Sequence, residues 1–289
     1  MKDFVISTDT ASDLSLQYCK EHQIDMHSLF YRFGEDELYG NEKQLPIDVF
    51  YQRMRDGEMP TTMATNPEDS VDLFRKQLTA GHDILHIAFS SGLSGSYQSA
   101  VIAADQLKEE FPESQIIVID SLCASAGEGL LVYKAMAYKD AGHSLEETAD
   151  YVRATAPFIS HQFTVDSLFH LQRGGRVSKA TAIVGTIIGI KPLLHVDDAG
   201  KLVSIGKARG RKKSLTSLVD AMMESIGEHD NSTIMISHGD CYEDAKFVGD
   251  LIQERNPKVT NVIINVICPT IGAHAGPGTV ALFFEADHR

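Results

Sequence analysis

The sequence predicts an α/β protein with a Rossmann-like first lobe, built on a parallel sheet, and a second α+β lobe with a mixed or antiparallel sheet. Through the first half of the chain, short β-rich runs alternate with helical patterns, which is typical of a parallel sheet wrapped by helices. After Pro157 the pattern changes to strands separated by turns and further helices. The 289 residues suffice for two lobes at roughly 150 residues per domain. We therefore expect lobes over residues 1–157 and 158–289.

Composition excludes several classes of protein. A hydrophobic content of 43% is too high for a disordered chain, and the net charge of -14 disfavours nucleic acid as a partner, because nucleic-acid binding depends on Lys and Arg. The four cysteines show neither a C-x-x-C pair nor zinc-site spacing, so we expect no metal and no cofactor. Residues 1–4 lead directly into a strand-like run without a signal segment, which predicts a cytoplasmic protein.

The first lobe is expected to contain strands near residues 4–7, 84–89 and 116–119. Asn66-Pro67 and the capping box at 144–147 mark helix starts, since side-chain acceptors there satisfy the first free N–H groups. Alternating aromatics and turn residues between 24 and 44 indicate a small β-insertion before a helix at 46–54.

The second lobe is expected to contain a hairpin around the Asp198-Ala199-Gly200 turn, two longer helices and three further strands. The hairpin strands are expected at 191–196 and 202–205, the helices at 214–226 and 240–254, and the other strands at 233–237, 261–267 and 279–285. An apolar helix at 179–188 is also expected, buried in the core or lining an apolar pocket.

Residues 90–99 (SSGLSGSYQS) follow an apolar strand and open a helix. Glycines there let the backbone approach a ligand, and hydroxyls at a helix amino end suit a carboxylate or phosphate. The alternative is that Ser94 and Ser96 only cap the helix, because Ser is a preferred N-cap. A second hydroxyl cluster, residues 60–65 with Thr62, precedes the helix start at Asn66, where capping is again the simpler interpretation.

Two further segments could meet a ligand. The run 171–178 (LQRGGRVS) places Arg173 and Arg176 on a tight turn, where an arginine could bind a carboxylate bidentately or be paired structurally. Residues 272–278 form a glycine-rich turn that carries His274 at its tip.

Sharper enzyme motifs are missing: the sequence has no G-x-S-x-G nucleophile elbow, no Walker A lysine and no H-E-x-x-H pair. Asp9 and Asp13 are not spaced as in an aspartyl phosphatase, so helix capping is the expected role for both.

An ordered set of motifs along nearly the whole chain resembles the DegV family. They are T-D-x-x-x-D-L at 8–14, P-T-T at 60–62, S-S-G-L-S-G-S-Y-Q-S-A at 90–100, D-S-x-x-x-S-x-G-x-G at 120–129, R-G-G-R-V-S at 173–178, G-x-x-x-G-I-K-P-L-L at 185–194 and G-P-G at 276–278. The resemblance implies a carrier, not an enzyme, which buries a long-chain fatty acid between two lobes and presents it to a separate ATP-dependent fatty acid kinase. It also implies that Thr62 and Ser94 bind the carboxylate and that His274, with Arg176, serves the head group or phosphotransfer.

A basic stretch stands out on the acidic chain. Its members are Lys201, Lys207, Arg209, Arg211, Lys212 and Lys213. It could dock the kinase or an anionic membrane surface, or be a solvated face. The rival functions are a stand-alone phosphotransfer or phosphatase-type enzyme that uses Ser94 or His274 on a small metabolite, and a regulatory module without a ligand.

Overall fold

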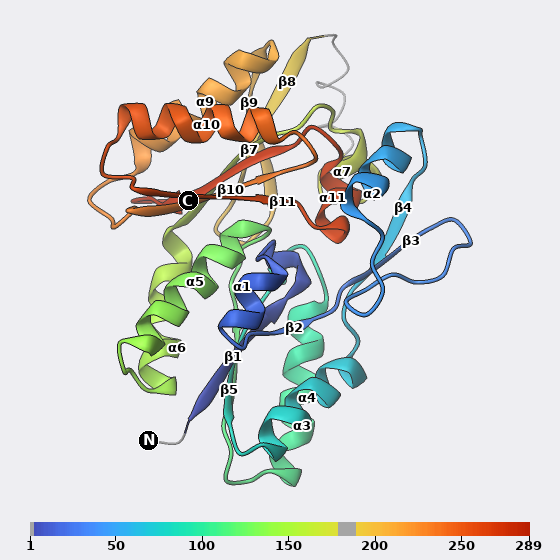
Figure 1. Ribbon diagram of the computed structural model, residues 1–289, viewed down its shortest axis with the longest axis vertical. Coiled ribbons are helices and arrows are strands. Elements are labelled where there is room, and N and C mark those ends of the chain that lie inside the picture. Colours follow the sequence, from blue (N-terminus) through green and yellow to red (C-terminus); the bar gives the residue numbers. More distant parts are fainter. Residues whose placement is uncertain (1–2, 179–188) are drawn as a thin grey trace.

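Two sheets dominate the computed structural model, which describes residues 3–178 and 189–289 (Figure 1). The first sheet is parallel throughout, with strand order β2-β1-β5-β6. Every residue of β1 and β5 is buried, as expected for a parallel sheet covered on both faces. The strands are β1 (Phe4–Asp9), β2 (Asp25–His27), β5 (Asp83–Ala88) and β6 (Ile116–Asp120).

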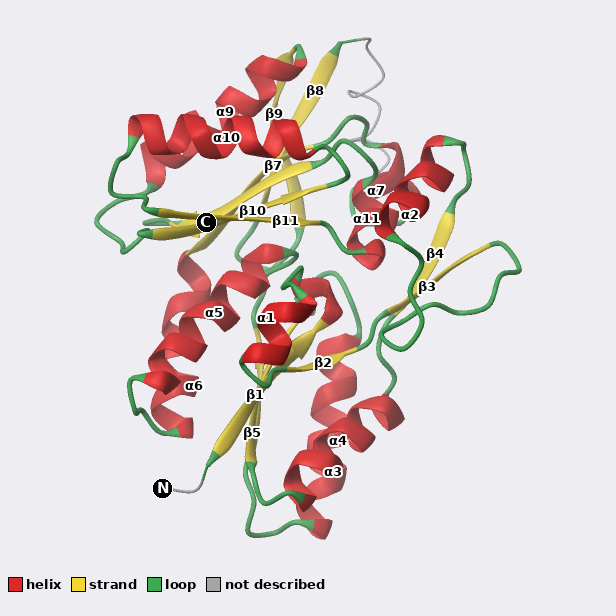
Figure 2. Ribbon diagram, in the orientation of Figure 1, coloured by secondary structure: helices red, strands yellow, loops and turns green. Residues whose placement is uncertain are grey.

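Helices cover both faces of this sheet, and each face packs against its helices through its own apolar cluster (Figure 2). One cluster joins the strands to α3 and α4, and the other joins them to α5 and α6. The expected helix starts are confirmed: Asn66 accepts the Asp69 N–H, and Ser144 forms a capping box with Glu147. The helices are α1 (Leu16–Glu21), α3 (Pro67–Thr79), α4 (Ser96–Glu110), α5 (Ala126–Asp140) and α6 (Leu145–Thr155).

The β-insertion differs from the expected range. Its strand β3 (Phe30–Phe33) pairs with β4 (Pro60–Met63), and α2 (Ile47–Arg55) lies between them in the chain. Residues 25–27 instead pair with β1 in the main sheet. Capping does not explain the hydroxyl cluster with Thr62: the N-cap of α3 is Asn66, and residues 60–63 of the cluster form β4. This strand could not be recognised locally, because its partner β3 precedes it by the whole of α2.

The second sheet is mixed, with strand order β11-β10-β12-β7-β8-β9. Only the β10–β11 pair is parallel among these described strands. The predicted hairpin is confirmed: β8 and β9 are antiparallel, and Gly200 has φ +70° in the connecting turn. The strands are β7 (Ile159–Thr164), β8 (Ile190–Val196), β9 (Leu202–Arg209), β10 (Thr233–His238), β11 (Asn261–Val266) and β12 (Val280–Glu285).

The helices α9 (Arg211–Ser225) and α10 (Tyr242–Arg255) pack on the outer face of the second sheet (Figure 2). The opposite face turns toward the first sheet, because Phe163 and Phe283 share one apolar cluster with Leu130 of α5. The short helices α7 (Phe169–Arg173) and α11 (Pro269–Ala275) lie near the insertion. The apolar helix expected at 179–188 lies outside the described residues. Pro157 lies in a 3-10 turn between α6 and β7, and the lobe boundary there stays a prediction.

Candidate functional site

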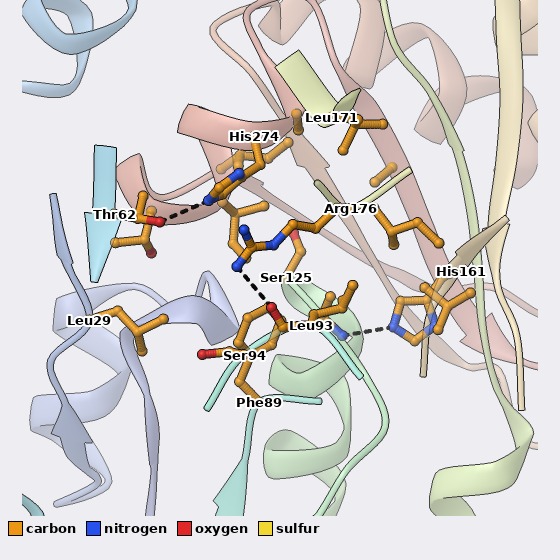
Figure 3. Close-up of a pocket in the computed structure, with 18 of the residues that line it drawn as sticks. Leu29, Thr62, Phe89, Leu93, Ser94, Ser125, His161, Leu171, Arg176 and His274 are labelled. Atoms are coloured by element: carbon orange, nitrogen blue, oxygen red, sulfur yellow. Dashed lines mark hydrogen bonds between the residues drawn. The ribbon is translucent and has the colours of Figure 1, made fainter. Parts of the chain in front are cut away.

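A mostly apolar cavity of about 190 Å³ lies between the two sheets (Figure 3). A single water needs only about 10–15 Å³ of such space, so the cavity has room for a ligand of many atoms. Its apolar wall combines side chains from both sheets and from the loops between them. This wall includes Phe89, Leu93, Ala124, Phe163, Leu171, Val196, Leu202, Ile271, Ala281 and Phe283.

The four site residues expected from the sequence all line this cavity: Thr62, Ser94, Arg176 and His274. They come from β4, the loop before α4, the turn after α7 and α11, which are far apart in the chain. Thr62 Oγ1 lies 2.8 Å from His274 Nε2, and the two side chains point toward one another in Figure 3. We call these four residues the polar end of the cavity.

His274 lies on a helix, which corrects the expected glycine-rich turn. Pro269 occupies the first turn of α11, and Gly276, with φ +83°, ends the helix. His274 packs so closely against the Arg173–Arg176 turn that a Cβ on Gly174 would lie 2.0 Å from its Nδ1 atom. Only glycine fits at position 174 without displacing the imidazole.

Burial keeps the His274 ring neutral. It lowers the pKa of His274 to about 4, and the charges of Arg176 and Arg173 act in the same direction. Among the described residues, Nδ1 of His274 has no hydrogen-bond partner. Near pH 7 the ring is therefore uncharged, with one nitrogen facing the Thr62 hydroxyl.

The two arginines of the turn brace the polar end through backbone carbonyls. Arg173 donates to the carbonyls of Pro60 (2.6 Å) and Ala273 (3.3 Å), which belong to the strand of Thr62 and to the helix of His274. Arg176 donates to the Leu93 carbonyl at 2.9 Å, directly before Ser94. Structural pairing thus accounts for Arg173, which does not line the cavity, whereas Arg176 combines such pairing with a place in the cavity wall.

Ser94 combines the two roles that the sequence left open. Its Oγ accepts the Ser96 N–H at 3.3 Å and lies 3.0 Å from the Ser96 hydroxyl, close to the start of α4. The N-cap position itself is Gly95, which has no side chain. Ser94 therefore supports the helix start while lining the cavity.

Asp9 and Asp13 are not helix caps, contrary to expectation. Asp9 precedes a 3-10 helix without a side-chain cap bond and accepts the Phe89 N–H at 2.7 Å. Asp13 accepts the Cys268 N–H at 2.8 Å and the Ser125 hydroxyl, so its carboxylate links the residue before α11 to the residue before α5. The T-D-x-x-x-D-L motif was the sequence signal for these two residues. The motif does not reveal their hydrogen-bond partners, which lie far away in the chain.

Glu128, at the start of α5, completes what we call the acid cluster with Asp9 and Asp13. Its Oε1 accepts the Thr8 hydroxyl and the Asp9 N–H. Burial raises the pKa of Asp9 to about 7. The pKa of Glu128 is raised well above its usual value, mainly by burial and also by the neighbouring charge of Asp9. No group of side chains suited to holding a metal ion occurs within residues 3–178 and 189–289.

The fold and site together define a class: an α/β protein with a parallel and a mixed sheet that enclose an apolar cavity with one polar end. The chain belongs to the DegV family, whose model, described as "Uncharacterised protein, DegV family", matches residues 3–287. A DegV domain-containing protein of Clostridium perfringens is 41% identical over 290 residues, which cover 100% of this chain and 99% of the relative.

Solved structures of the family share the fold. A DegV family protein from Thermus thermophilus, described by its fatty acid binding, has 26% identity and a TM-score of 0.86 over 99% of this chain and 100% of its own. A stearic acid-binding protein from Eubacterium ventriosum has 25% identity and a TM-score of 0.87, with 97% of each chain covered. Within the described part of the present chain, no helix is long and apolar enough to cross a membrane.

Proposed function

We propose that the protein binds a long-chain fatty acid, with the tail in the apolar cavity and the carboxylate at the polar end. The observation that carries the proposal is the gathering of Thr62, Ser94, Arg176 and His274 at one place in an otherwise mostly apolar wall. The fatty-acid binding of family members with the same fold supports it.

Apolar burial sets the affinity in this proposal. At about 0.8 kcal/mol per buried methylene, a tail of roughly 14 methylenes contributes on the order of 11 kcal/mol before ordering costs. A neutral hydrogen bond adds only about 1 kcal/mol. The hydroxyls therefore orient the acid more than they hold it.

The neutral His274 ring orients the Thr62 hydroxyl. If Nε2 carries the ring proton, it donates to Thr62 Oγ1 across the 2.8 Å contact, and the Thr62 hydrogen is free to point at a carboxylate oxygen. Ser94 supplies a second hydroxyl, and the Arg176 guanidinium supplies positive charge. The polar end then offers two hydroxyl donors and one guanidinium to a carboxylate.

Native mass spectrometry of the purified protein tests the proposal. We expect a bound mass of a long-chain acid, and rebinding of oleate after the lipid has been removed. A protein that stays empty under both conditions would contradict the carrier, and turnover of a small phosphorylated metabolite by that empty protein would favour the stand-alone enzyme.

The finer role is presentation of the bound acid to an ATP-dependent fatty acid kinase that forms an acyl phosphate. The family resemblance supports this role. Within the basic stretch, Arg211 is already paired with Asp244 at 2.8 Å, so its charge is partly used inside the protein. The other five members are exposed: Lys201, Lys207, Arg209, Lys212 and Lys213. Of these, Lys213 lies 3.8 Å from Asp220 in a surface ion pair.

Charge reversal of Lys207 and Arg209 on β9 tests the docking role. We expect slower kinase-coupled phosphorylation of oleate with unchanged oleate binding. Unchanged coupling in the variant would show that the stretch is a solvated face. Lys258→Glu, at an exposed position before β11 at the opposite edge of the sheet, is the control.

A further inference from the structure

A second cavity of about 260 Å³ adjoins the first one. Leu29 and Thr270 line both cavities and form the wall between them. Leu29 directly precedes β3, whose Phe30 pairs with Met63 beside Thr62, and Figure 3 shows Leu29 on the Thr62 side, across from His161. The shared wall is therefore at the polar end of the first cavity.

The second cavity is lined mainly by apolar atoms, and apart from Asp13 its polar groups include neutral hydroxyls and amides. They are Thr10, Ser15, Asn41, Gln44, Asn265 and Thr270. The side-chain amides of Asn265 and Gln44 have no hydrogen-bond partner among the described residues. The cavity thus offers unused donors and acceptors close to the place where a head group would lie.

Charge in the second cavity disfavours an anion. No Lys, Arg or His is among the described residues that line it, and its one carboxylate, Asp13, already accepts the Cys268 N–H and the Ser125 hydroxyl. A phosphate group placed there would lose its hydration without gaining a counter-charge. Hydroxyl groups would be satisfied by the free amides.

We propose that the protein also binds acyl lipids with a neutral polyol head group, of the monoacylglycerol class, an inference that rests on the proposed function. The acyl tail occupies the first cavity, the ester carbonyl accepts from Thr62, and the glycerol hydroxyls pass Leu29 to reach Asn265 and Gln44. Leu29, with 6% of its surface exposed, is the partition that must turn aside.

Competition against a fluorescent fatty acid tests this proposal with two ligands matched in acyl chain, laurate and 1-monolauroylglycerol. The wild type is expected to bind both. Asn265→Leu combined with Gln44→Leu should weaken the ester about thirtyfold, the loss expected for two hydrogen bonds of about 1 kcal/mol each, and leave laurate within about twofold. Leu29→Ala should favour the ester relative to laurate. Asn261→Leu, an exposed site on the same strand outside both cavities, is the control.

The outcomes separate the two proposals. Binding of laurate without the ester, or equal effects of the double variant on both ligands, would overturn the polyol site alone. Failure of the wild type to bind either ligand would overturn the fatty-acid proposal as well. If the double variant does not fold, as judged by circular dichroism, Gln44→Leu alone, at an exposed position, is expected to weaken only the ester, and an unchanged ester affinity would count against the site.

Discussion

Two polar clusters lie between the sheets and differ in how their hydrogen bonds are used. In the acid cluster, Asp9 and Asp13 accept bonds from the chain's own N–H and O–H groups. At the polar end of the cavity, Thr62 and Ser94 face a hollow. The acid cluster follows β1, at the sheet edge where open α/β folds gather ligands. Occupation of that edge by carboxylates leaves the neighbouring hollow as the place for a ligand.

The largest effect is expected from a substitution in the acid cluster. Asp13→Ala should lower the free energy of unfolding by roughly 2–4 kcal/mol, because it leaves the Cys268 N–H and the buried Ser125 hydroxyl without an acceptor. Urea unfolding followed by circular dichroism measures it, since the chain has no tryptophan. Asp13→Asn keeps one acceptor and should lose less. A change below about 0.5 kcal/mol in Asp13→Ala, the scale of ordinary surface substitutions, would contradict this role.

A pH series sharpens the comparison. The pKa of Asp9 is raised to about 7 and that of Glu128 lies well above its usual value, so the folded state holds protons that the unfolded chain releases above about pH 4–5. The contribution of Asp9 and Glu128 to the free energy of unfolding is therefore present at low pH and is lost as the pH rises through 7. Glu128→Gln should therefore lose less stability than the wild type between pH 5 and 8, by about 1 kcal/mol or more.

The control for the pH series is Glu146→Gln, at an exposed site on α6. Buried histidines such as His27, whose pKa is lowered to about 3, change stability in the opposite direction below pH 6.5. They are common to all three proteins and cancel in the difference. Parallel pH profiles for wild type and Glu128→Gln would show that the carboxyl pair does not hold the extra proton.

At the polar end we expect a loss of function without a loss of fold. Thr62→Val should weaken oleate binding about fivefold to tenfold, the equivalent of one hydrogen bond, with an unfolding free energy near that of the wild type. Thr61→Val, at the exposed neighbouring position of β4, should bind normally. Equal affinities for the two variants would remove Thr62 from the carboxylate site.

The smallest expected effect concerns His274. Because its pKa is lowered to about 4, the ring stays neutral between pH 6 and 8. The ratio of oleate affinities between wild type and His274→Gln should therefore stay constant, within about twofold, over that range. A tenfold change in the ratio, measured by titration calorimetry, would mean that the ring gains a proton there.

The sequence by itself determined the element types and the candidate residues, because hydrophobic periodicity, caps and turn residues act over a few positions. Asn66 before Pro67 and the Asp198–Gly200 turn are of this kind. Thr62, Ser94, Arg176 and His274 could be selected through motifs whose order along the chain matches a family.

Only the tertiary structure decided which of these residues meet and what the other polar residues do. The bond between Thr62 and His274 joins positions 212 residues apart, and that between Asp13 and Cys268 joins positions 255 apart. A local pattern does not encode such distances, so Asp13 was mistaken for a cap and His274 was placed in a turn. Burial, which sets the charge of His274 and Glu128, likewise exists only after the two sheets have packed together.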